Sequence, residues 1–580
     1  MRNERYASCL PLLAVLALTA CGESQPTGAD VLFINAAVYT ADDQRSWAEA
    51  VAVDDGEIVF VGGSGAAREF VGSNTEIVDL TGKMLMPGFH DGHAHVQYGG
   101  ASASGCDLQY EEDVARIREL LLECAGAREY DDGEWVLGGR WPLAAFPDGN
   151  PASAMLDEVF AGRPAYFVDA FGHNGWASSS ALAIAGIDAE TADPPKGVIV
   201  RDPATGRPSG TLRDGAMALI EDFIPEASEE ELYSGLLAGL EQANAFGITA
   251  FIEPGADKER AALYQKADER RQLTARVLVS LSPINELPDK VGPELFELLA
   301  RRDQFKGTYL SADSVKIYID GVIETRTSFM LEPYLDGSNF PPFYAQDALD
   351  ELFSRLDAMG VQIHTHAIGD AAIRSALDAY EHARDTNGEN DNRHQVVHLQ
   401  LIDKQDIPRF AELGVAANFQ CMWCYPDVYV DLAADIVGDA RVQQFYPVRS
   451  IRDTGAVIAG GSDWDVSSLN PLDAIETAVR RQDPHAVSGR TLGENEEIDL
   501  ATALDMYTRN AAYVMRLDDR TGSIEPGKRA DLIVLDRNLF EIPATEINEA
   551  EVLLTMLDGA VVYSSQSFDA SFAAAFGGNQ

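Results

Sequence analysis

The segment MLMPGFHDGHAHV, residues 84–96, decides the fold of this 580-residue chain. Its first half is almost continuously apolar, as expected for a strand that is buried on both faces. The segment ends on His93 and His95, which are separated by one residue. Because side chains alternate along a strand, the two imidazoles lie on the same face, as a shared metal ion requires. The segment therefore predicts a buried strand with metal ligands at its end.

Seven further apolar runs follow. They are ITAFIEPG (248–255), ARVLVSLSP (275–283), SVKIYIDG (314–321), VQIHTHAIGD (361–370), HQVVHLQLI (394–402), GVAANFQ (414–420) and GAVIAGGSDW (455–464). Helix-like amphipathic segments separate most of them, and this alternation favours a parallel sheet. Eight such units predict an α/β fold of the TIM-like (β/α)8 barrel type, with catalytic groups at the C-terminal strand ends.

The two ends of the chain predict a second, smaller domain. Short β-type runs with Asp-Gly turns occur within residues 31–83 and again within residues 522–570. We expect these segments to form one composite β-sandwich domain closed by both chain ends. The barrel then spans residues 84–521. Within it, residues 97–245 are too long for one helix and loop, so they are expected to form an insertion that caps the barrel mouth.

More side chains of the metal-binding type stand at predicted strand ends. His366 and His398 end the fifth and sixth strands, and Asp463 ends the eighth. An isolated histidine is usually a core or surface residue. Several histidines at barrel strand ends, together with an aspartate, point instead to a metal site.

Lys316 is the unusual member of this set, because its strand otherwise suits a barrel interior. A bare ammonium is costly to bury, and desolvation depresses the pKa of a lysine. The neutral amine can react with carbon dioxide to give a carbamate, whose two oxygens suit a bridge between two divalent ions. The alternative is a structural lysine paired with Asp320 or Glu324.

Several phrases spread over nearly the whole chain carry a family resemblance. They are MPGFHDGHAHV, GHNGWASSSALAIAGI, GVIVRDPATGRPSGTLRDGA, VKIYIDG, HAIGDAA, HLQLIDKQDIPRFAELGV, GGSDW and SIEPGKRADLIVLDRN. These motifs resemble those of the amidohydrolase superfamily and, within it, of the third amidohydrolase family, which includes N-substituted formamide deformylases. The resemblance implies a metal-dependent hydrolase that cleaves the C–N bond of an amide, N-acyl or N-formyl compound by a metal-activated hydroxide.

The resemblance also implies a centre of two divalent ions, with zinc as the expected metal. Its ligands would be His93 and His95 on the first ion, His366 and His398 on the second, carbamylated Lys316 between them, and Asp463 on the first ion. Asp463 would also act as the general base. Asp91 and Asp320 are candidates to support the ligands from behind.

The sequence identifies the residues that bind substrate less specifically than the metal ligands. His173, in GHNGW, is implied to donate a hydrogen bond to the substrate or transition state, with a structural histidine as the alternative. The candidates for substrate binding on the loops expected above the metals are Trp176, Arg326, Trp423 and Trp464. Clustered aromatic rings with few basic residues favour a small neutral amide that carries an apolar or aromatic group.

Other activities of the same superfamily stay open, namely those of a lactonase, a dipeptidase or a deaminase. A deaminase usually has a catalytic Glu shortly after the fifth-strand histidine, where this chain has Ile368-Gly369-Asp370. A non-catalytic, lipid-anchored binding protein on the same barrel is the alternative from another class. It would have lost one or more ligands, and all six are present.

The charge of the chain excludes one class of partner. Lys and Arg number 44 against 93 Asp and Glu, which gives a formal net charge of −49. Long-range attraction to nucleic acid is thereby excluded, and so is attraction to anionic lipid. The surface is either solubilising in the ordinary sense or adapted to salty surroundings.

The N-terminus predicts export. Residues 1–20 combine two arginines with the apolar run 10–18, which is too short to span a bilayer. The sequence LTACG then resembles the lipobox of bacterial lipoproteins, with Cys21 as the lipidated residue and residues 21–30 as tether. Gly22-Glu23 lacks the aspartate after the cysteine that often retains such proteins in the inner membrane, so we expect an outer-membrane lipoprotein that faces the periplasm. A plain signal peptide is the alternative.

The other cysteines do not form a disulfide scaffold. Cys106 and Cys124 can pair in an oxidising compartment, although sequence alone leaves this open. Cys421 and Cys424 have the spacing of a redox or zinc pair, but no second pair accompanies them. Two buried or pocket-lining thiols are the favoured interpretation.

Overall fold

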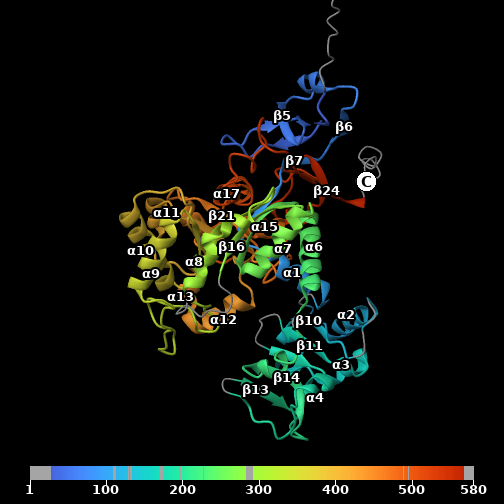
Figure 1. The fold of residues 1–580 in the computed structure, drawn as a ribbon, viewed down its shortest axis with the longest axis vertical. Helices are drawn as coiled ribbons and strands as arrows, with labels where there is room; N and C mark the ends of the chain where they lie inside the picture. The colour runs from blue at the N-terminus through green and yellow to red at the C-terminus, as the bar shows by residue number, and fades with distance from the viewer. Residues whose placement is uncertain are drawn as a thin grey trace, which may run out of the picture.

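The computed structural model has three parts arranged along its long axis, with a β domain at one end, a barrel in the middle and the inserted segment at the other end (Figure 1). It describes residues 28–108, 111, 113–127, 130, 133–169, 174–194, 197–225, 227–282, 292–486, 489–493, 495–566 and 568. Cys21 and His173 lie outside the described residues. Within the described part, no helix has the length and apolar character needed to cross a membrane.

The middle part contains an eight-stranded sheet in which every pair of neighbours runs parallel. Its strands in chain order are β8 (Phe89–Asp91), β15 (Ile248–Ala256), β16 (Arg276–Leu281), β17 (Leu310–Tyr318), β18 (Gln362–Ala367), β19 (Gln395–His398), β20 (Ala416–Phe419) and β21 (Ile458–Gly460). The backbone N–H of Gly92 donates to the carbonyl of Gly460 at 2.8 Å and brings the last strand against the first. The predicted (β/α)8 barrel is confirmed.

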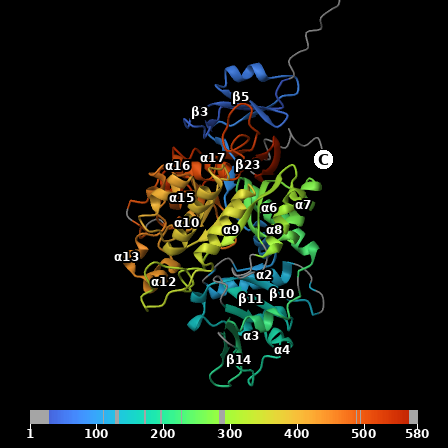
Figure 2. The ribbon, with the colours of Figure 1, turned by 60° about the vertical axis from the view of Figure 1, so that its left-hand side comes forward.

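Helices surround this sheet, as Figure 2 shows for α6 to α10 and α15. Their bounds are α6 (Glu229–Ala245), α7 (Lys258–Glu269), α8 (Pro293–Ala300), α9 (Gln346–Ala358), α10 (Asp370–Asn387), α11 (Ile407–Leu413), α14 (Val448–Arg452), α15 (Pro471–Arg480), α16 (Leu500–Met506) and α17 (Arg509–Val514). Side chains along β18 point alternately toward the surrounding helices and into the barrel. Thr365 points outward and its hydroxyl lies 2.6 Å from that of Tyr380 on α10, whereas His364 and His366 point into the barrel.

The β domain is built from both chain ends. One sheet has the order β5-β4-β1-β6 and the other β24-β23-β22-β7-β2-β3. The strands are β1 (Val31–Ile34), β2 (Ala37–Tyr39), β3 (Trp47–Ala48), β4 (Ala50–Asp54), β5 (Glu57–Gly62), β6 (Glu76–Asp79), β7 (Met84–Pro87), β22 (Leu532–Leu535), β23 (Val552–Leu557) and β24 (Ala560–Ser564). Apolar side chains of the two sheets, among them Val51, Leu85 and Leu532, share one core.

The start of the barrel was predicted wrongly. Residues 84–87 were expected in the first barrel strand, yet they form β7, which pairs with β2 and β22 of the β domain. The barrel begins at Phe89. A run that is apolar throughout does not reveal which of two sheets buries it, because periodicity is then uninformative.

Buried polar contacts fix the β domain to the barrel floor. Arg276, at the start of β16, donates to both carboxylate oxygens of Asp531 at 2.6 and 3.0 Å. His90 of β8 lies 2.8 Å from the hydroxyl of Thr521. Because these residues are almost wholly buried, the two parts share a desolvated polar interface as well as an apolar one.

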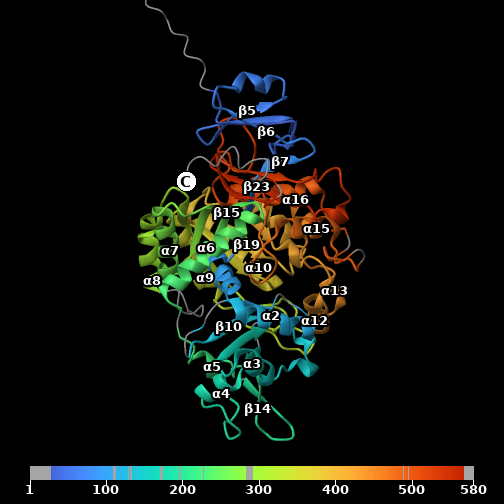
Figure 3. The same ribbon diagram turned by 90° about the vertical axis from the view of Figure 1, so that its right-hand side faces the viewer.

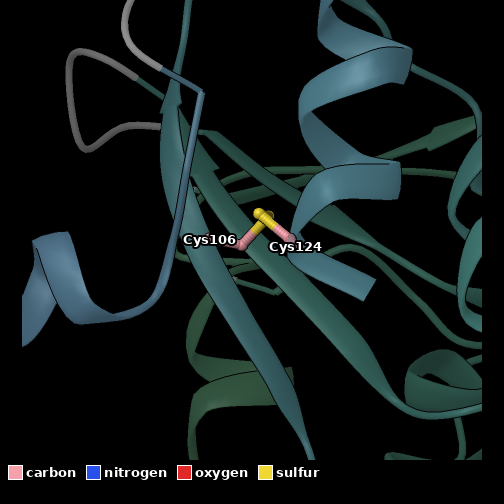
Figure 4. Close-up of a disulfide and its surroundings, with 2 residues drawn as sticks. All are labelled: Cys106 and Cys124. Carbon is pink, nitrogen blue, oxygen red and sulfur yellow. A yellow bond between two sulfur atoms is a disulfide. The ribbon is translucent and has the colours of Figure 1, made fainter. Parts of the chain in front are cut away.

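The inserted segment has its own sheet, of order β13-β14-β12-β11-β10-β9. Its elements are β9 (Cys106–Asp107), α2 (Val114–Ala127), β10 (Val136–Trp141), α3 (Ser153–Phe160), β11 (Ala165–Asp169), β12 (Asn174–Ala177), α4 (Ser179–Ile184), β13 (Gly197–Arg201) and β14 (Pro208–Asp214). The Cys106–Cys124 disulfide joins β9 to α2 (Figure 4). Figure 3 shows this unit below the barrel, on the side away from the β domain.

The expected insertion of residues 97–245 is too wide. Helix α1 (Val96–Ser104) and helix α6 pack directly against each other beside the barrel. A Cβ on Gly100 would lie 2.0 Å from the carbonyl oxygen of Gly235, so only glycine permits this approach of the two backbones. The inserted unit therefore lies between these two helices, which belong to the barrel.

Candidate metal centre

The C-terminal ends of the barrel strands bring the six predicted ligands together. Both His93 and His95 place Nε2 3.3 Å from one carboxylate oxygen of Asp463. The other oxygen of Asp463 lies 3.8 Å from Nδ1 of His398, whose ring centre is 4.5 Å from that of His366. Three strands, β17 to β19, and the segments after β8 and β21 thus converge on one point.

The side chain of Lys316 belongs to the same cluster. Its Nζ lies 3.3 Å from Nε2 of His93 and 5.1 Å from the centre of the Tyr318 ring. Its side chain is fully buried, and among the described residues no carboxylate lies within ion-pairing distance of it. The structural alternative, a pair with Asp320 or Glu324, is therefore wrong.

The backbone at two of these positions is unusual. Asp463 has a φ of 52° and His398 a φ of 79°, in the left-handed region that non-glycine residues rarely adopt. The Asp463 N–H donates to the carbonyl of His93 at 2.7 Å, so the turn after β21 is tied to the first strand. Strained conformations of this kind concentrate at functional sites, where the surrounding structure holds them in place.

Burial sets the protonation of the cluster. It lowers the pKa of His93 and of His366 to about 3, and the neighbouring Lys316 acts in the same direction. Burial alone would raise the pKa of Asp463, but the imidazoles, His93 first, bring it well below its ordinary value. Neutral imidazoles around an ionised carboxylate are in the protonation state that a divalent ion requires of its ligands.

The geometry fits a metal ion. One ligand atom from each of His93, His398 and Asp463 lies within 4.8 Å of the others, and all three residues are buried. Nitrogen and carboxylate oxygen are the donors that zinc and similar divalent ions take in catalytic sites. His95 and His366, which are more exposed, extend the set toward the barrel mouth.

Asp91 and Asp320 support the centre through the backbone. Asp91 accepts the N–H of His93 at 2.9 Å and that of Ser462 at 3.0 Å, which links the first strand to the turn after the eighth. Asp320 accepts the N–H groups of Ile368 and Gly369 after the fifth strand. Burial raises the pKa of Asp91 to about 6 and that of Asp320 to about 7. They hold the loops that carry the ligands.

Sequence reasoning missed two residues that touch the ligands. Nε2 of His364 lies 2.7 Å from Nδ1 of His93, and Oε1 of Gln420 lies 2.8 Å from Nδ1 of His398. His364 was visible in principle, because it forms a second His-x-His pair with His366 and so faces the same side of its strand. Gln420 had no such signal.

The structure places the residues expected to bind substrate in different surroundings. Trp176 is fully buried in the core of the inserted unit, where its indole N–H donates to the carbonyl of Ala152, so its predicted role is wrong. Trp464 follows Asp463, is 5% exposed and belongs to the hydrophobic core around the barrel, so its role in binding substrate stays a prediction. Arg326 is half exposed and forms an ion pair with Asp336 at 3.3 Å.

Trp423 lies beside the centre, with its ring stacked on His398 at a centroid distance of 5.5 Å. Tyr318, at the end of β17, adds apolar surface nearby, since it is 39% exposed and its ring centre lies 5.2 Å from that of His366. Aromatic surface thus borders the polar centre.

Comparison with known proteins agrees with this site. The amidohydrolase family model matches residues 76–563. Protein LONG AFTER FAR-RED 3 of Arabidopsis thaliana is 30% identical over 92% of both chains. The N-substituted formamide deformylase of Arthrobacter pascens is 28% identical, over 92% of this chain and 98% of its own. In structure, an uncharacterised metal-dependent hydrolase from Pyrococcus furiosus matches with a TM-score of 0.69 at 22% identity, covering 88% of this chain and 99% of that one. The chain therefore belongs to the amidohydrolase family and is a metal-dependent hydrolase that acts on carbon–nitrogen bonds.

Proposed function

We propose that this enzyme uses two zinc ions to hydrolyse a small neutral amide, N-acyl or N-formyl compound that carries an apolar or aromatic group. The observation that carries the proposal is Lys316, which is buried among four histidines and Asp463 and has no carboxylate partner among the described residues. A lysine in that position is costly unless its nitrogen is modified or used.

The ligand set supports two ions. His93 and His95 would hold the first together with Asp463, and His366 and His398 the second. Burial lowers the pKa of Lys316 from its ordinary 10.5 to about 7, so the neutral amine is available near neutral pH. That amine forms a C–N bond to the carbon of carbon dioxide and loses a proton to solvent. The resulting carbamate anion would bridge the two ions.

When bound, the ions would lower the pKa of a water molecule to about 7 and polarise the substrate carbonyl. Asp463 supplies the proton transfer. Its carboxylate is ionised, buried and held by two imidazoles, so it can take a proton from water and return it to the leaving nitrogen. Tyr318 and Trp423 would place the apolar part of the substrate beside the centre.

The choice of a neutral substrate rests on charge. The protein carries −49, which disfavours the approach of polyanions. Arg326, the basic candidate for a carboxylate anchor, is already paired with Asp336. The deformylase relative is named for N-substituted formamides, a neutral class of amide.

Metal analysis with an amide panel tests the proposal. The purified enzyme is expected to hold about two zinc ions per chain and to prefer aromatic N-formyl or N-acyl amides over carboxylate-bearing ones. Lys316→Ala should lower both metal content and turnover, and short carboxylic acids should partly restore both, since a free carboxylate can replace the bridge. Full activity with one ion per chain, or a clear preference for carboxylate-bearing substrates, contradicts the proposal.

We further propose that the enzyme is an exported lipoprotein of the bacterial cell envelope, anchored at Cys21 in the outer membrane and facing the periplasm. The lipobox-like LTACG supports this location, and the Cys106–Cys124 pairing is compatible with an oxidising compartment. Cys21→Ser should release the protein from the membrane fraction with unchanged kinetics. Finding the wild type in the soluble fraction with its signal removed contradicts the anchor.

A further inference from the structure

A buried histidine without an assigned role lies directly behind the metal centre. His364 is on β18 and pairs in register with Lys316 on β17, one layer below His366. Its side chain is fully buried, and its Nε2 lies 2.7 Å from Nδ1 of His93. Interior positions of such barrels are usually filled by branched apolar side chains, so an imidazole here calls for an explanation.

The contact between the two rings has a definite direction once His93 binds metal. A histidine that presents Nε2 to an ion carries its proton on Nδ1, which must then donate. The acceptor at that distance is Nε2 of His364. His364 must therefore carry its own proton on Nδ1, the atom for which the described residues provide no partner.

This arrangement differs from that of a structural histidine in the same barrel. His394 is mostly buried, with 14% of its side chain exposed, and both of its nitrogens are used: Nδ1 accepts the N–H of Ile363 at 3.0 Å, and Nε2 lies 3.1 Å from the carboxylate of Asp357. His364 uses only the nitrogen that faces His93. Its polar contact is thus directed at the ligand, and no described residue bonds its other nitrogen.

We propose that His364 is a positioning residue that holds His93 in the tautomer and ring orientation that present Nε2 to the metal. The inference rests on the proposed metal centre and adds to it a neutral acceptor behind one ligand. Partners of this kind orient ligating imidazoles, and their loss typically weakens metal binding by about 10- to 100-fold.

Zinc affinity of the metal-depleted protein, measured by competition with a chromophoric chelator, tests the proposal. His364→Phe fills the space without an acceptor and should raise the zinc Kd by about 10- to 100-fold. His364→Gln retains a side-chain oxygen that can accept from Nδ1 of His93, and we expect its zinc Kd within about threefold of the wild-type value. The absorption spectrum of the cobalt-substituted protein should change in the Phe variant and much less in the Gln variant.

His394→Phe is the matched control, because it removes another largely buried imidazole of the same barrel, 14% exposed, whose hydrogen bonds go to Ile363 and Asp357 and not to a ligand. It should lower the thermal midpoint of the metal-free protein and leave the zinc Kd unchanged. If His364→Phe fails to fold, His364→Met provides a second side chain without a strong acceptor.

Three results overturn the inference: a wild-type zinc Kd in the Phe or Met variant, an equal loss of affinity in the Gln variant, or an equal loss in His394→Phe. They are distinguishable from a failure of the metal centre itself. If the metal centre itself were absent, the wild-type protein would bind no zinc, and the variants could not differ from it in zinc affinity.

Discussion

Replacing Lys316 by Met should stabilise the metal-free protein while abolishing its activity. The side chain is buried and has no carboxylate partner within the described part of the chain, so keeping it charged destabilises the folded state. Methionine has a similar length and no charge, and it can occupy the same space. Without an amine, however, no carbamate can form. The substitution therefore separates stability from function at one residue.

The size of the stability difference follows from the pKa of Lys316. Burial lowers it from 10.5 to about 7, and at about 1.4 kcal/mol per pH unit this difference of about 3.5 amounts to about 5 kcal/mol. The sign follows from proton binding. Between about pH 7 and 10.5 the unfolded chain binds more protons at this lysine than the folded chain, so wild-type stability rises with pH. The penalty is complete below about pH 7 and absent above about pH 10.5.

Urea unfolding of the metal-free wild type and Lys316→Met at pH 6.5 and at pH 10, in buffers free of carbon dioxide, measures this difference. We expect the variant to be more stable at pH 6.5 by several kcal/mol and the advantage to shrink nearly to zero at pH 10. Packing effects of the substitution do not depend on pH and cancel in the comparison of the two pH values. Lys404→Met, at an exposed lysine, is the control and should show no such trend.

An advantage that stays the same at both pH values would refute the reasoning, because it would come from packing alone. A variant that is less stable than the wild type at pH 6.5 would also refute it, since the buried lysine would then be contributing to the fold. Either result would remove the energetic argument for a modified Lys316.

Three further outcomes follow from the structure. Asp463→Asn should keep much of its metal but lose about 10²- to 10⁴-fold in turnover, because an amide cannot transfer the proton; metal analysis beside kinetics checks this, and loss of the metal would assign Asp463 mainly to binding. Arg276→Met leaves the Asp531 carboxylate buried without its cation, so urea unfolding should show a loss of about 3–5 kcal/mol; a change below about 1 kcal/mol would mean that solvent reaches the pair. Screening should relieve the repulsion of a chain at −49, so the thermal midpoint should rise between low salt and about 1 M NaCl; a falling midpoint would contradict this.

The ligands could be predicted from sequence because one local rule suffices to locate them. His93, His95, His366, His398 and Asp463 each end or follow an apolar run whose end must face the barrel mouth. The expected alternation of His93 and His95 along a strand was wrong, because β8 ends at Asp91 and both residues lie between it and α1. The position of Lys316 inside an apolar run also places it in the interior, where its charge has a cost whatever surrounds it.

The aromatic residues could not be sorted in this way. Trp176 and Trp464 were expected in the substrate pocket and are core residues, whereas Trp423 lies against His398. A tryptophan in a loop between elements has the same local pattern in either case, and tryptophan is highly buried on average. Only the fold of the inserted unit, with Trp141 and Trp176 in one core, decides between the two positions.

The contacts behind the ligands were beyond prediction for a different physical reason. Gln420 reaches His398 from the next strand, and His364 reaches His93 from the other side of the barrel, 271 residues along the chain. Each contact depends on the barrel closing with one register, so no local pattern encodes it. The carboxylates at the centre instead bind backbone: Asp91 and Asp320 hold N–H groups of the ligand-bearing loops. His93 and His398 are therefore backed by neutral groups while the carboxylates fix the loops. It follows that substitutions at His364 should act on metal affinity and those at Asp320 on loop order, although both lie next to the same centre.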